Sequence, residues 1–262
     1  MFAFTGTREA LAGDTMYLDV LDMKRFYEQR LGLVVRTLVG QRIHAQWPNL
    51  SGMRVLSLGF TTPYLSPYLN QAERVIAAMP AQQGVMVWPP EGPNRATLVD
   101  EYNLPLPDAC IDRALLVHTL DQSNDSLAVL REVWRVLAPG GRMLAVVPNR
   151  RSLWAQFETS PFGYGRPFSR GQLSAFLREA RFKPTAAEGA LYVPPFRSHL
   201  LIRSASGWER VGHRLWPAFA SVLVVEAEKQ VYQTTPKEPG KAATRLFRPV
   251  FVTDGRPAAR YG

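Results

Sequence analysis

Residues 130–149 read LREVWRVLAPGGRMLAVVPN, and this stretch decides the fold class of the chain. Apolar residues recur at the spacing of a single helical face, at Leu127, Leu130, Trp134 and Leu137. The sequence Pro-Gly-Gly at 139–141 ends such a helix, because proline cannot continue it and glycine accepts a left-handed conformation. Residues 143–147 are continuously apolar, as in a parallel strand that is covered on both faces. The stretch therefore predicts a helix followed by a buried strand, which is half of an α/β unit.

The length of 262 residues suits one large domain, or one domain with extensions. A single cysteine, Cys110, excludes a disulfide within the chain, and we therefore expect a cytoplasmic location. Residues 1–14 lack an apolar segment behind a basic one, so no signal peptide is predicted. No apolar run approaches the roughly 18 residues of a membrane-spanning helix, and no membrane span is expected.

The net charge of +9 lies in the C-terminal part of the chain. Residues 1–150 carry 14 basic and 14 acidic side chains, whereas residues 151–262 carry 17 basic and 8 acidic ones. An excess of positive charge attracts phosphate-rich or acidic molecules. The charge therefore indicates nucleic acid or an acidic protein as a partner. The alternative is a solvated basic surface without a specific partner.

Periodicity, capping residues and helix breakers predict the other elements. Helices are expected over residues 16–31, 33–46, 66–79, 169–180 and 208–216. Strands are expected over residues 53–58, 84–88, 183–193 and 221–231. Two helices thus precede the first strand, and helices alternate with strands after it.

Three stretches resemble the class I S-adenosylmethionine-dependent methyltransferases, and in particular their type 11-like domain. REVWRVLAPGGRM at 131–143 is similar to the fourth helix and fifth strand of that family. DEYNLPLPD at 100–108 and CIDRALLVH at 110–118 are similar to the family's run before the fourth strand and to that strand itself. The resemblance covers about two thirds of the chain. It implies a Rossmann-like, doubly wound α/β sheet of about seven strands, in the order 3-2-1-4-5-7-6 with the last strand antiparallel.

The resemblance also implies a division of the chain into three parts. A helical N-terminal cap is expected over residues 1–49, and the methyltransferase-like Rossmann domain is expected over residues 50–232. Residues 233–262 are rich in Pro, Gly, Lys and Arg, a composition that predicts a basic, mobile tail.

The first strand and the turn after it depart from the glycine-rich pattern of the family. Family members carry an acidic residue in the strand and then glycines, which let backbone N–H groups approach the cofactor. Residues 55–64 read VLSLGFTTPY, so Gly59 matches, whereas Ser57 replaces the acid and Thr61 replaces the second glycine. Trp88 is expected at the end of the second strand, where the family has an acid that accepts from the ribose hydroxyls.

The resemblance places S-adenosyl-L-methionine at the ends of the first, second and fourth strands. The implied cofactor-binding residues are Gly59, Phe60, Thr61, Trp88, Asp100, Glu101 and His118. Asp100 would accept from the adenine amino group; its alternative is an ordinary turn or capping aspartate. An aromatic and glycine-rich loop follows the fifth strand and is a candidate substrate loop. The candidate substrate-binding residues are Tyr64, Arg151, Trp154, Tyr164 and Arg166.

The sequence thus predicts an S-adenosylmethionine-dependent methyltransferase, without identifying its methyl acceptor. Such an enzyme acts mainly by holding the reacting atoms in line, so it needs no obligatory catalytic triad, and no catalytic or metal-binding residue is assigned. The alternative is a methyltransferase-like protein that has lost the cofactor and serves as a scaffold or regulator on nucleic acid or a protein. The altered glycine turn and the missing ribose acid favour the scaffold, whereas the Asp100 region and the aromatic loop favour the enzyme.

Overall fold

The computed structural model describes residues 17–152, 154–156, 160–192, 207, 209, 212, 214 and 220–231. The chain divides into two units, residues 1–231 and residues 232–262, and every described residue lies in the first unit. The predicted tail and most of the predicted helix over 208–216 therefore lie outside the described residues. The division into a cap, a Rossmann domain and a tail stays a prediction.

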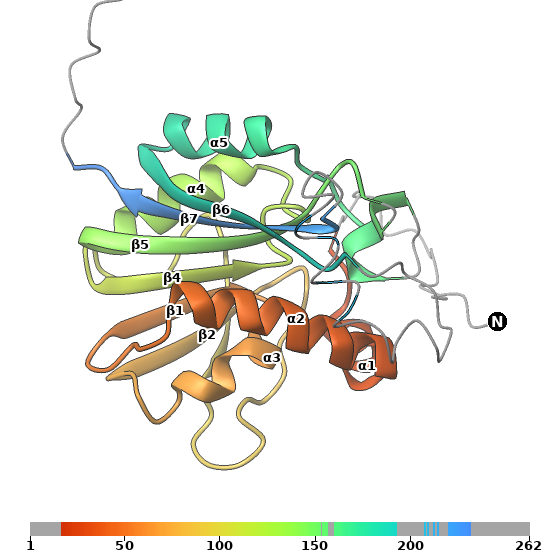
Figure 1. The fold of residues 1–262 in the computed structure, drawn as a ribbon. Helices are drawn as coiled ribbons and strands as arrows, with labels where there is room; N and C mark the ends of the chain where they lie inside the picture. The colour runs from red at the N-terminus through yellow and green to blue at the C-terminus, as the bar shows by residue number, and fades with distance from the viewer. Residues whose placement is uncertain are drawn as a thin grey trace, which may run out of the picture. The chain divides into compact units, whose positions relative to one another are not determined.

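Seven strands form one mixed sheet in the order β3-β2-β1-β4-β5-β7-β6 (Figure 1). The strands are β1 (Arg54–Gly59), β2 (Arg74–Pro80), β3 (Ala96–Val99), β4 (Ile111–Val117), β5 (Leu137–Pro148), β6 (Phe182–Ala190) and β7 (Val222–Lys229). Strands β1 to β5 pair in parallel, whereas β7 is antiparallel to its neighbours β5 and β6. This topology confirms the predicted doubly wound sheet and its strand order.

Helices cover both faces of the sheet (Figure 1). They are α1 (Val20–Glu28), α2 (Arg30–Gln46), α3 (Thr62–Leu65), α4 (Ser126–Val136) and α5 (Arg170–Glu179), with short 3₁₀ turns η1 (Ser66–Tyr68), η2 (Trp154–Gln156) and η3 (Pro161–Gly163). Successive strand residues face opposite sides: Leu115 packs in the core shared with α1 and α2, and Leu116 packs in the core shared with α4 and α5. The central strands are therefore buried on both faces.

The helix and strand predicted around residues 130–149 are confirmed as α4 and β5. Asp125 caps α4, because its side chain accepts hydrogen bonds from the N–H groups of Leu127 and Ala128. Gly140 has the expected left-handed φ of +73°, but the Pro-Gly-Gly sequence does not end the helix. Helix α4 already ends at Val136 with Leu137 as an extended C-cap, and residues 139–141 lie inside β5. Trp134 is only partly buried. Its indole Nε1 donates to the carbonyl oxygen of Gln230 at 3.2 Å. The fully buried face of the helix is formed instead by Val129, Leu130, Val133 and Val136.

The region between β1 and β3 was predicted wrongly in two respects. The helix expected over 66–79 is limited to α3 and the turn η1, and residues 74–80 form strand β2. Residues 84–88, all within the described chain, contain no strand. The cause is that β2 is buried on both faces, so its apolar residues follow one another without a period of two. A short apolar run of this kind cannot be distinguished from a helix by spacing alone.

The two N-terminal helices approach each other very closely. Asp19 caps α1 by accepting from the N–H of Leu21 at 2.7 Å. The predicted break at Gly32 occurs three residues earlier, at Gln29, and Gly32 lies inside α2. A Cβ atom on Gly32 would overlap the carbonyl oxygen of Phe26, so only glycine fits this crossing.

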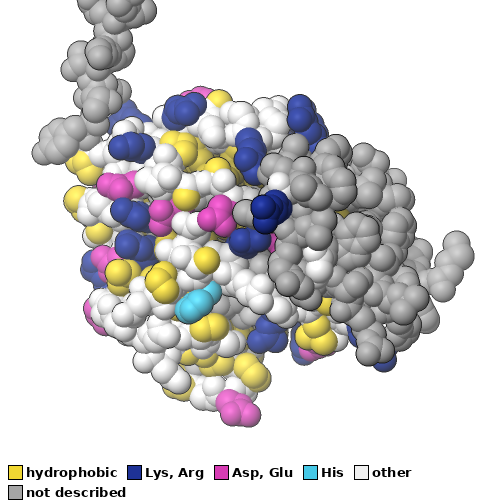
Figure 2. All heavy atoms as spheres, in the orientation of Figure 1, with side chains coloured by type: hydrophobic (Ala, Val, Ile, Leu, Met, Phe, Trp, Pro, Cys, Tyr) yellow, Lys and Arg dark blue, Asp and Glu magenta, His cyan; other side chains and the backbone are white. Residues whose placement is uncertain are grey.

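Basic and acidic side chains are interspersed on the face drawn in Figure 2, where no single basic patch stands out. Among the described residues, no helix is both long and apolar enough to cross a membrane. The nucleic-acid or acidic-protein partner therefore stays a prediction that rests on the charge of residues 151–262.

We expect Gly32→Ala to destabilise the protein by about 2 kcal/mol or more, because the methyl group forces α1 and α2 apart. Gly40→Ala is the matched control in the same helix, since the atom nearest to its added Cβ is Tyr64 Cδ1 at 3.7 Å. That control should be neutral or stabilising by up to about 1 kcal/mol, from the helix propensity of alanine. Urea unfolding of both variants measures the difference, and equal stabilities would contradict the close crossing.

Candidate functional site

The carboxyl ends of β1, β2, β3 and β4 meet at one edge of the sheet. The chain passes from β1 outward to β3 and then returns to the opposite side of β1 as β4, so the strand order reverses between β1 and β4. Ligands of open α/β sheets bind outside such a reversal point. Gly59 ends β1 and His118 directly follows β4, so these two predicted site residues lie at this edge.

The turn after β1 is held by contacts within the protein. Gly59 has a φ of +88°, and a Cβ atom on it would overlap the hydroxyl of Thr119 and the carbonyl oxygen of Val117. The Thr61 hydroxyl donates to the hydroxyl of Ser57 at 2.7 Å. The residues that replace the family's acid and second glycine thus bind each other, and Thr61 has no free proton to donate to a ligand.

Two neighbouring acids after β3 have different surroundings. The Asp100 side chain is exposed, and its Oδ1 accepts from the N–H of Tyr102 at 2.9 Å, which is the turn contact that the sequence left open as an alternative. Glu101 is buried and accepts a hydrogen bond from the hydroxyl of Tyr17 at 3.2 Å. Burial and the nearby Glu101 carboxylate raise the pKa of Tyr17 well above its usual range, so this phenol stays protonated.

Trp88 is not at the carboxyl edge, because it does not end a strand. Its carbonyl oxygen accepts from the N–H of Arg95, which immediately precedes β3, so Trp88 lies beside the start of that strand. Its side chain is buried in the core shared with α1 and α2. The residues that follow β2 at the edge are 81–83, and Gln83 among them is fully buried.

The loop after β4 carries five buried polar side chains, each at most 1% exposed: His118, Thr119, Asp121, Gln122 and Ser123. Nε2 of His118 lies 2.9 Å from the hydroxyl of Tyr27, and its Nδ1 lies 3.8 Å from Oδ2 of Asp121. His118 also has a φ of +54°, a left-handed conformation that is uncommon outside glycine. Strained conformations of this kind concentrate at functional sites.

The segment that precedes α1 crosses this edge of the sheet. The N–H of Leu18 donates to Oε1 of Gln122 at 3.2 Å, and the N–H of Val20 donates to the carbonyl oxygen of Gln83 at 2.8 Å. Together with the Tyr17 contact to Glu101, these bonds tie residues 17–20 to the ends of β2, β3 and β4. The segment therefore forms a cover over the site.

Of the five candidate substrate residues, Tyr64 and Trp154 join a buried aromatic group around His118. The hydroxyl of Tyr64 lies 3.0 Å from that of Tyr27, and Trp154 meets the ring of Phe162 edge to face. The Phe162 ring in turn lies 4.6 Å from the ring of His118, measured between centroids. Tyr164 is partly buried against the same core. The side chains of the other two candidates, Arg151 and Arg166, are exposed.

Several buried polar atoms at this edge have no hydrogen-bond partner among the described residues. They are Nε2 and Oε1 of Gln83, Nδ1 of His118, Oδ1 and Oδ2 of Asp121, and Nε2 of Gln122. A buried polar group without a partner costs about 1–3 kcal/mol, so each of these atoms favours occupation of the site by a polar ligand or by water. The sequence did not predict Gln83 or Gln122 as site residues. Gln83 was missed because the second strand was expected at residues 84–88, which put Trp88 at its end.

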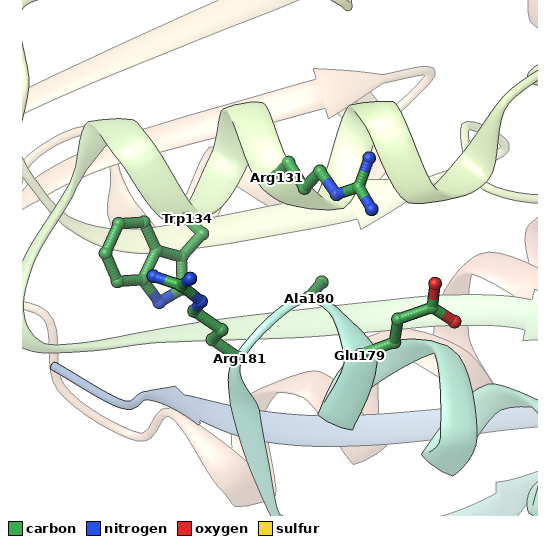
Figure 3. Close-up of a pocket in the computed structure, with 5 residues that line it drawn as sticks. All are labelled: Arg131, Trp134, Glu179, Ala180 and Arg181. Carbon is green, nitrogen blue, oxygen red and sulfur yellow. The ribbon is translucent and has the colours of Figure 1, made fainter. Parts of the chain in front are cut away.

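A second hollow is unrelated to this site (Figure 3). It lies between the last turns of α4 and α5 and is lined by Arg131, Trp134, Glu179, Ala180 and Arg181. Trp134 reaches Gln230 beyond the end of β7, which is the opposite edge of the sheet. The hollow combines charges of both signs.

Comparisons with known proteins agree with the fold. The family model described as a methyltransferase domain matches residues 56–145, from β1 to β5. A solved S-adenosylmethionine-dependent methyltransferase from Thermotoga maritima is 19% identical and has a TM-score of 0.56, with 80% of this chain and 96% of that chain covered. The chain therefore has the fold of that methyltransferase, and residues 56–145 are similar to the methyltransferase domain family.

Two curated relatives match parts of the chain. Malonyl-[acyl-carrier protein] O-methyltransferase of Pectobacterium atrosepticum is 28% identical over 166 residues, which are 62% of this chain and 60% of the relative. 27-O-demethylrifamycin SV methyltransferase of Amycolatopsis mediterranei is 35% identical over 96 residues, or 34% of this chain and 35% of the relative. The chain thus spans less than two thirds of the length of either relative.

We expect Gly59→Ala to destabilise the protein by roughly 3 kcal/mol or more, because backbone strain adds to overlap with Thr119 and Val117. Gly92→Ala is the matched control: its φ is +90°, and no described atom lies within 4 Å of its added Cβ. Backbone strain alone should cost that variant about 1 kcal/mol. Thermal unfolding without any ligand separates the two, and equal losses would show that Gly59 is not required by the packing of β1 against β4.

Proposed function

We propose that this protein is an S-adenosylmethionine-dependent methyltransferase whose cofactor binds at the carboxyl edge of β1, β2 and β4, beneath residues 17–20. The observation that carries the proposal is the Gln83 side chain, which is buried after β2 with neither amide atom paired within the described chain. The family fold places a dinucleotide-type or nucleoside ligand at this reversal point. Gln83 then supplies the polar contact that the cofactor's ribose requires.

The chemistry of a glutamine amide fits a ribose diol. Its Oε1 accepts a hydrogen bond from one hydroxyl, and its Nε2 donates to the oxygen of the other. The position agrees as well, because Gln83 follows the last residue of β2, Pro80, by three residues. A neutral amide binds more weakly than the acid that the family uses, since hydrogen bonds to charged groups are about twice as strong.

The other cofactor residues implied by the resemblance differ in how well their geometry supports them. Glu101 and His118 are buried at the carboxyl edge, which supports a place beside the ligand. Gly59, Phe60 and Thr61 supply backbone at the end of β1. Asp100 is exposed and Trp88 is beside the start of β3, so their proposed roles have less support.

The aromatic group that includes Tyr64 and Trp154 is the proposed acceptor side of the site. Its rings give an apolar surface beside the polar edge, and such a surface excludes water from a transferring methyl group. Both curated relatives act on oxygen according to their names. We infer from these names only that transfer to oxygen is compatible with this type of domain.

A second candidate function is a methyltransferase-like scaffold that binds no cofactor. The contact of Thr119 with Gly59 and the bond from Thr61 to Ser57 favour it, because both fill or use the turn that usually receives the cofactor. Under this alternative, waters satisfy Gln83 and its neighbours.

Calorimetric titration with S-adenosylhomocysteine tests the proposal. We expect Gln83→Leu to weaken binding by about 10-fold or more, because two hydrogen bonds worth about 0.5–1.5 kcal/mol each are lost. Gln82→Leu is the matched control, since Gln82 is the preceding residue and is exposed. That control should bind with wild-type affinity.

The thermal stability of the ligand-free Gln83→Leu variant provides a separate check. The amide has no partner within the described chain, so its replacement by an apolar side chain should not lower the unfolding temperature. Equal affinities of both variants and the wild type would show that the ligand lies elsewhere. Absence of binding by the wild-type protein would favour the scaffold.

A further inference from the structure

Four buried polar side chains form a continuous series at the end of β4. The hydroxyl of Tyr64 lies 3.0 Å from the hydroxyl of Tyr27, which lies 2.9 Å from Nε2 of His118. On the other side of the ring, Nδ1 of His118 lies 3.8 Å from Oδ2 of Asp121. The side chains of His118 and Asp121 are 1% and 0% exposed. The series therefore joins helix α1, the turn after β1 and the loop after β4.

Either hydroxyl can be the donor between Tyr64 and Tyr27, and the donor between Tyr27 and His118 depends on the tautomer of the ring. Burial and the neighbouring Tyr64 hold the pKa of Tyr27 well above its usual range, so its hydroxyl keeps its proton. In the arrangement that serves proton transfer, Tyr27 donates to Nε2 of His118 and accepts from Tyr64. A neutral imidazole that accepts at Nε2 carries its own proton at Nδ1, and that proton faces Asp121.

Two features of this series lower the stability of the folded protein. Both oxygens of Asp121 lack a hydrogen-bond partner within the described residues, although the side chain is inaccessible to water. A buried carboxylate beside a histidine stabilises a positive charge on that ring. His118 also adopts its left-handed backbone conformation here, which typically costs about 1–3 kcal/mol.

The series also lies next to the turn that ends β1. The carbonyl oxygen of His118 lies 3.3 Å from the position of a Cβ atom built on Gly59. The ring of Tyr27 stacks on Phe60, with 5.5 Å between the centroids. The imidazole is therefore at the reversal point itself, between the proposed cofactor side and the proposed acceptor side.

From this arrangement we infer that Tyr27, His118 and Asp121 form the proton acceptor for methyl transfer, and that the methyl acceptor is a hydroxyl group. The inference rests on the proposed function, because it requires S-adenosylmethionine as the methyl donor. An amine can keep the positive charge that it gains with a methyl group. A hydroxyl oxygen becomes a strongly acidic oxonium unless its proton leaves during the transfer, so it needs a base.

The step balances in atoms and electrons. The hydroxyl oxygen forms a bond to the methyl carbon, and the carbon–sulfur bond breaks with its electron pair going to sulfur. Tyr27 passes its proton to Nε2 of His118 and takes up the proton of the acceptor hydroxyl. The tyrosine is thereby restored, and the imidazolium is stabilised by Asp121 until it releases a proton to solvent.

The charge of the donor gives a test that needs no methyl acceptor. S-adenosylmethionine has a positively charged sulfur, whereas S-adenosylhomocysteine lacks the methyl group and is neutral there. Affinities of the full-length protein for both compounds are measured by calorimetry from about pH 7 to about pH 5, where histidine gains a proton and the ligands' α-amino groups stay protonated. The titratable groups facing His118 in the described chain are Tyr27 from α1, Tyr64 from α3 and Asp121 from its own loop.

We expect the ratio of the dissociation constant of S-adenosylmethionine to that of S-adenosylhomocysteine to rise about 10-fold or more as the pH falls. The sign follows because protonated His118 repels the sulfonium and has no such effect on the neutral thioether. In His118→Gln the ratio should stay constant. In Asp121→Asn the rise should move to lower pH, because the carboxylate that favours the imidazolium is gone.

His44→Gln is the matched control, because His44 is an exposed histidine on α2 and its loss should leave the rise unchanged. Binding of S-adenosylhomocysteine shows that each variant is folded. If His118→Gln does not bind this compound, the inference is tested by whether the rise of the ratio moves to lower pH in Asp121→Asn. A wild-type ratio that is independent of pH, with both compounds bound, would overturn the inference and leave the proposed function intact. Absence of binding of both compounds by the wild type would overturn both.

Discussion

The contact between Gly59 and Thr119 joins the end of β1 to the loop after β4. The Thr119 hydroxyl donates to the carbonyl oxygen of Leu58 at 2.7 Å, and no side chain on Gly59 could be accommodated beside it. Because the two strands are neighbours at the reversal point, their loops must leave the sheet through the same small space. The side chains that follow β4 are consequently turned inward and buried, and the site is built from them.

The polar side chains at the carboxyl edge of the sheet are buried, and burial strengthens their electrostatic interactions. The faces of the sheet are apolar, whereas unpaired buried polar atoms gather at the carboxyl edge, on Gln83, His118, Asp121 and Gln122. Residues 17–20 cover this edge with backbone hydrogen bonds to Gln83 and Gln122. In such a low-dielectric place each charge and each dipole acts more strongly than at the surface. This physical setting supports both the proposed ribose contact and the proposed proton acceptor.

The altered glycine turn is compatible with a working site if the polar contacts come from other elements. Ser57 and Thr61 bind each other, so they stabilise the turn and leave recognition to the ends of β2 and β4. Glutamine at position 83 offers a donor and an acceptor where the family has an acid. Under the proposed function, the fold is thus retained while the contacts with the cofactor come from other elements.

Local sequence determined the elements whose signals are strong. The apolar spacing within residues 130–149 is a property of neighbouring residues, and it predicted a helix followed by a strand, as α4 and β5 confirm. The end of the helix was predicted too late, because α4 stops at Val136, before the Pro-Gly-Gly sequence. The resemblance also gave the correct strand order, and Gly59 and His118 lie at the ends of β1 and β4, where it placed them. Strand β2 was missed because burial on both faces removes the alternation that identifies a strand.

Tertiary structure alone decided how the site is assembled. Tyr17 meets Glu101, Leu18 meets Gln122 and Tyr27 meets His118 across separations of 84, 104 and 91 residues. No spacing rule connects residues that far apart, because their proximity depends on how α1 packs on the sheet and on the reversal of strand order. The sequence determines which side chains are present. Their burial, and the effect of burial on their hydrogen bonding and charge, depends on the folded chain.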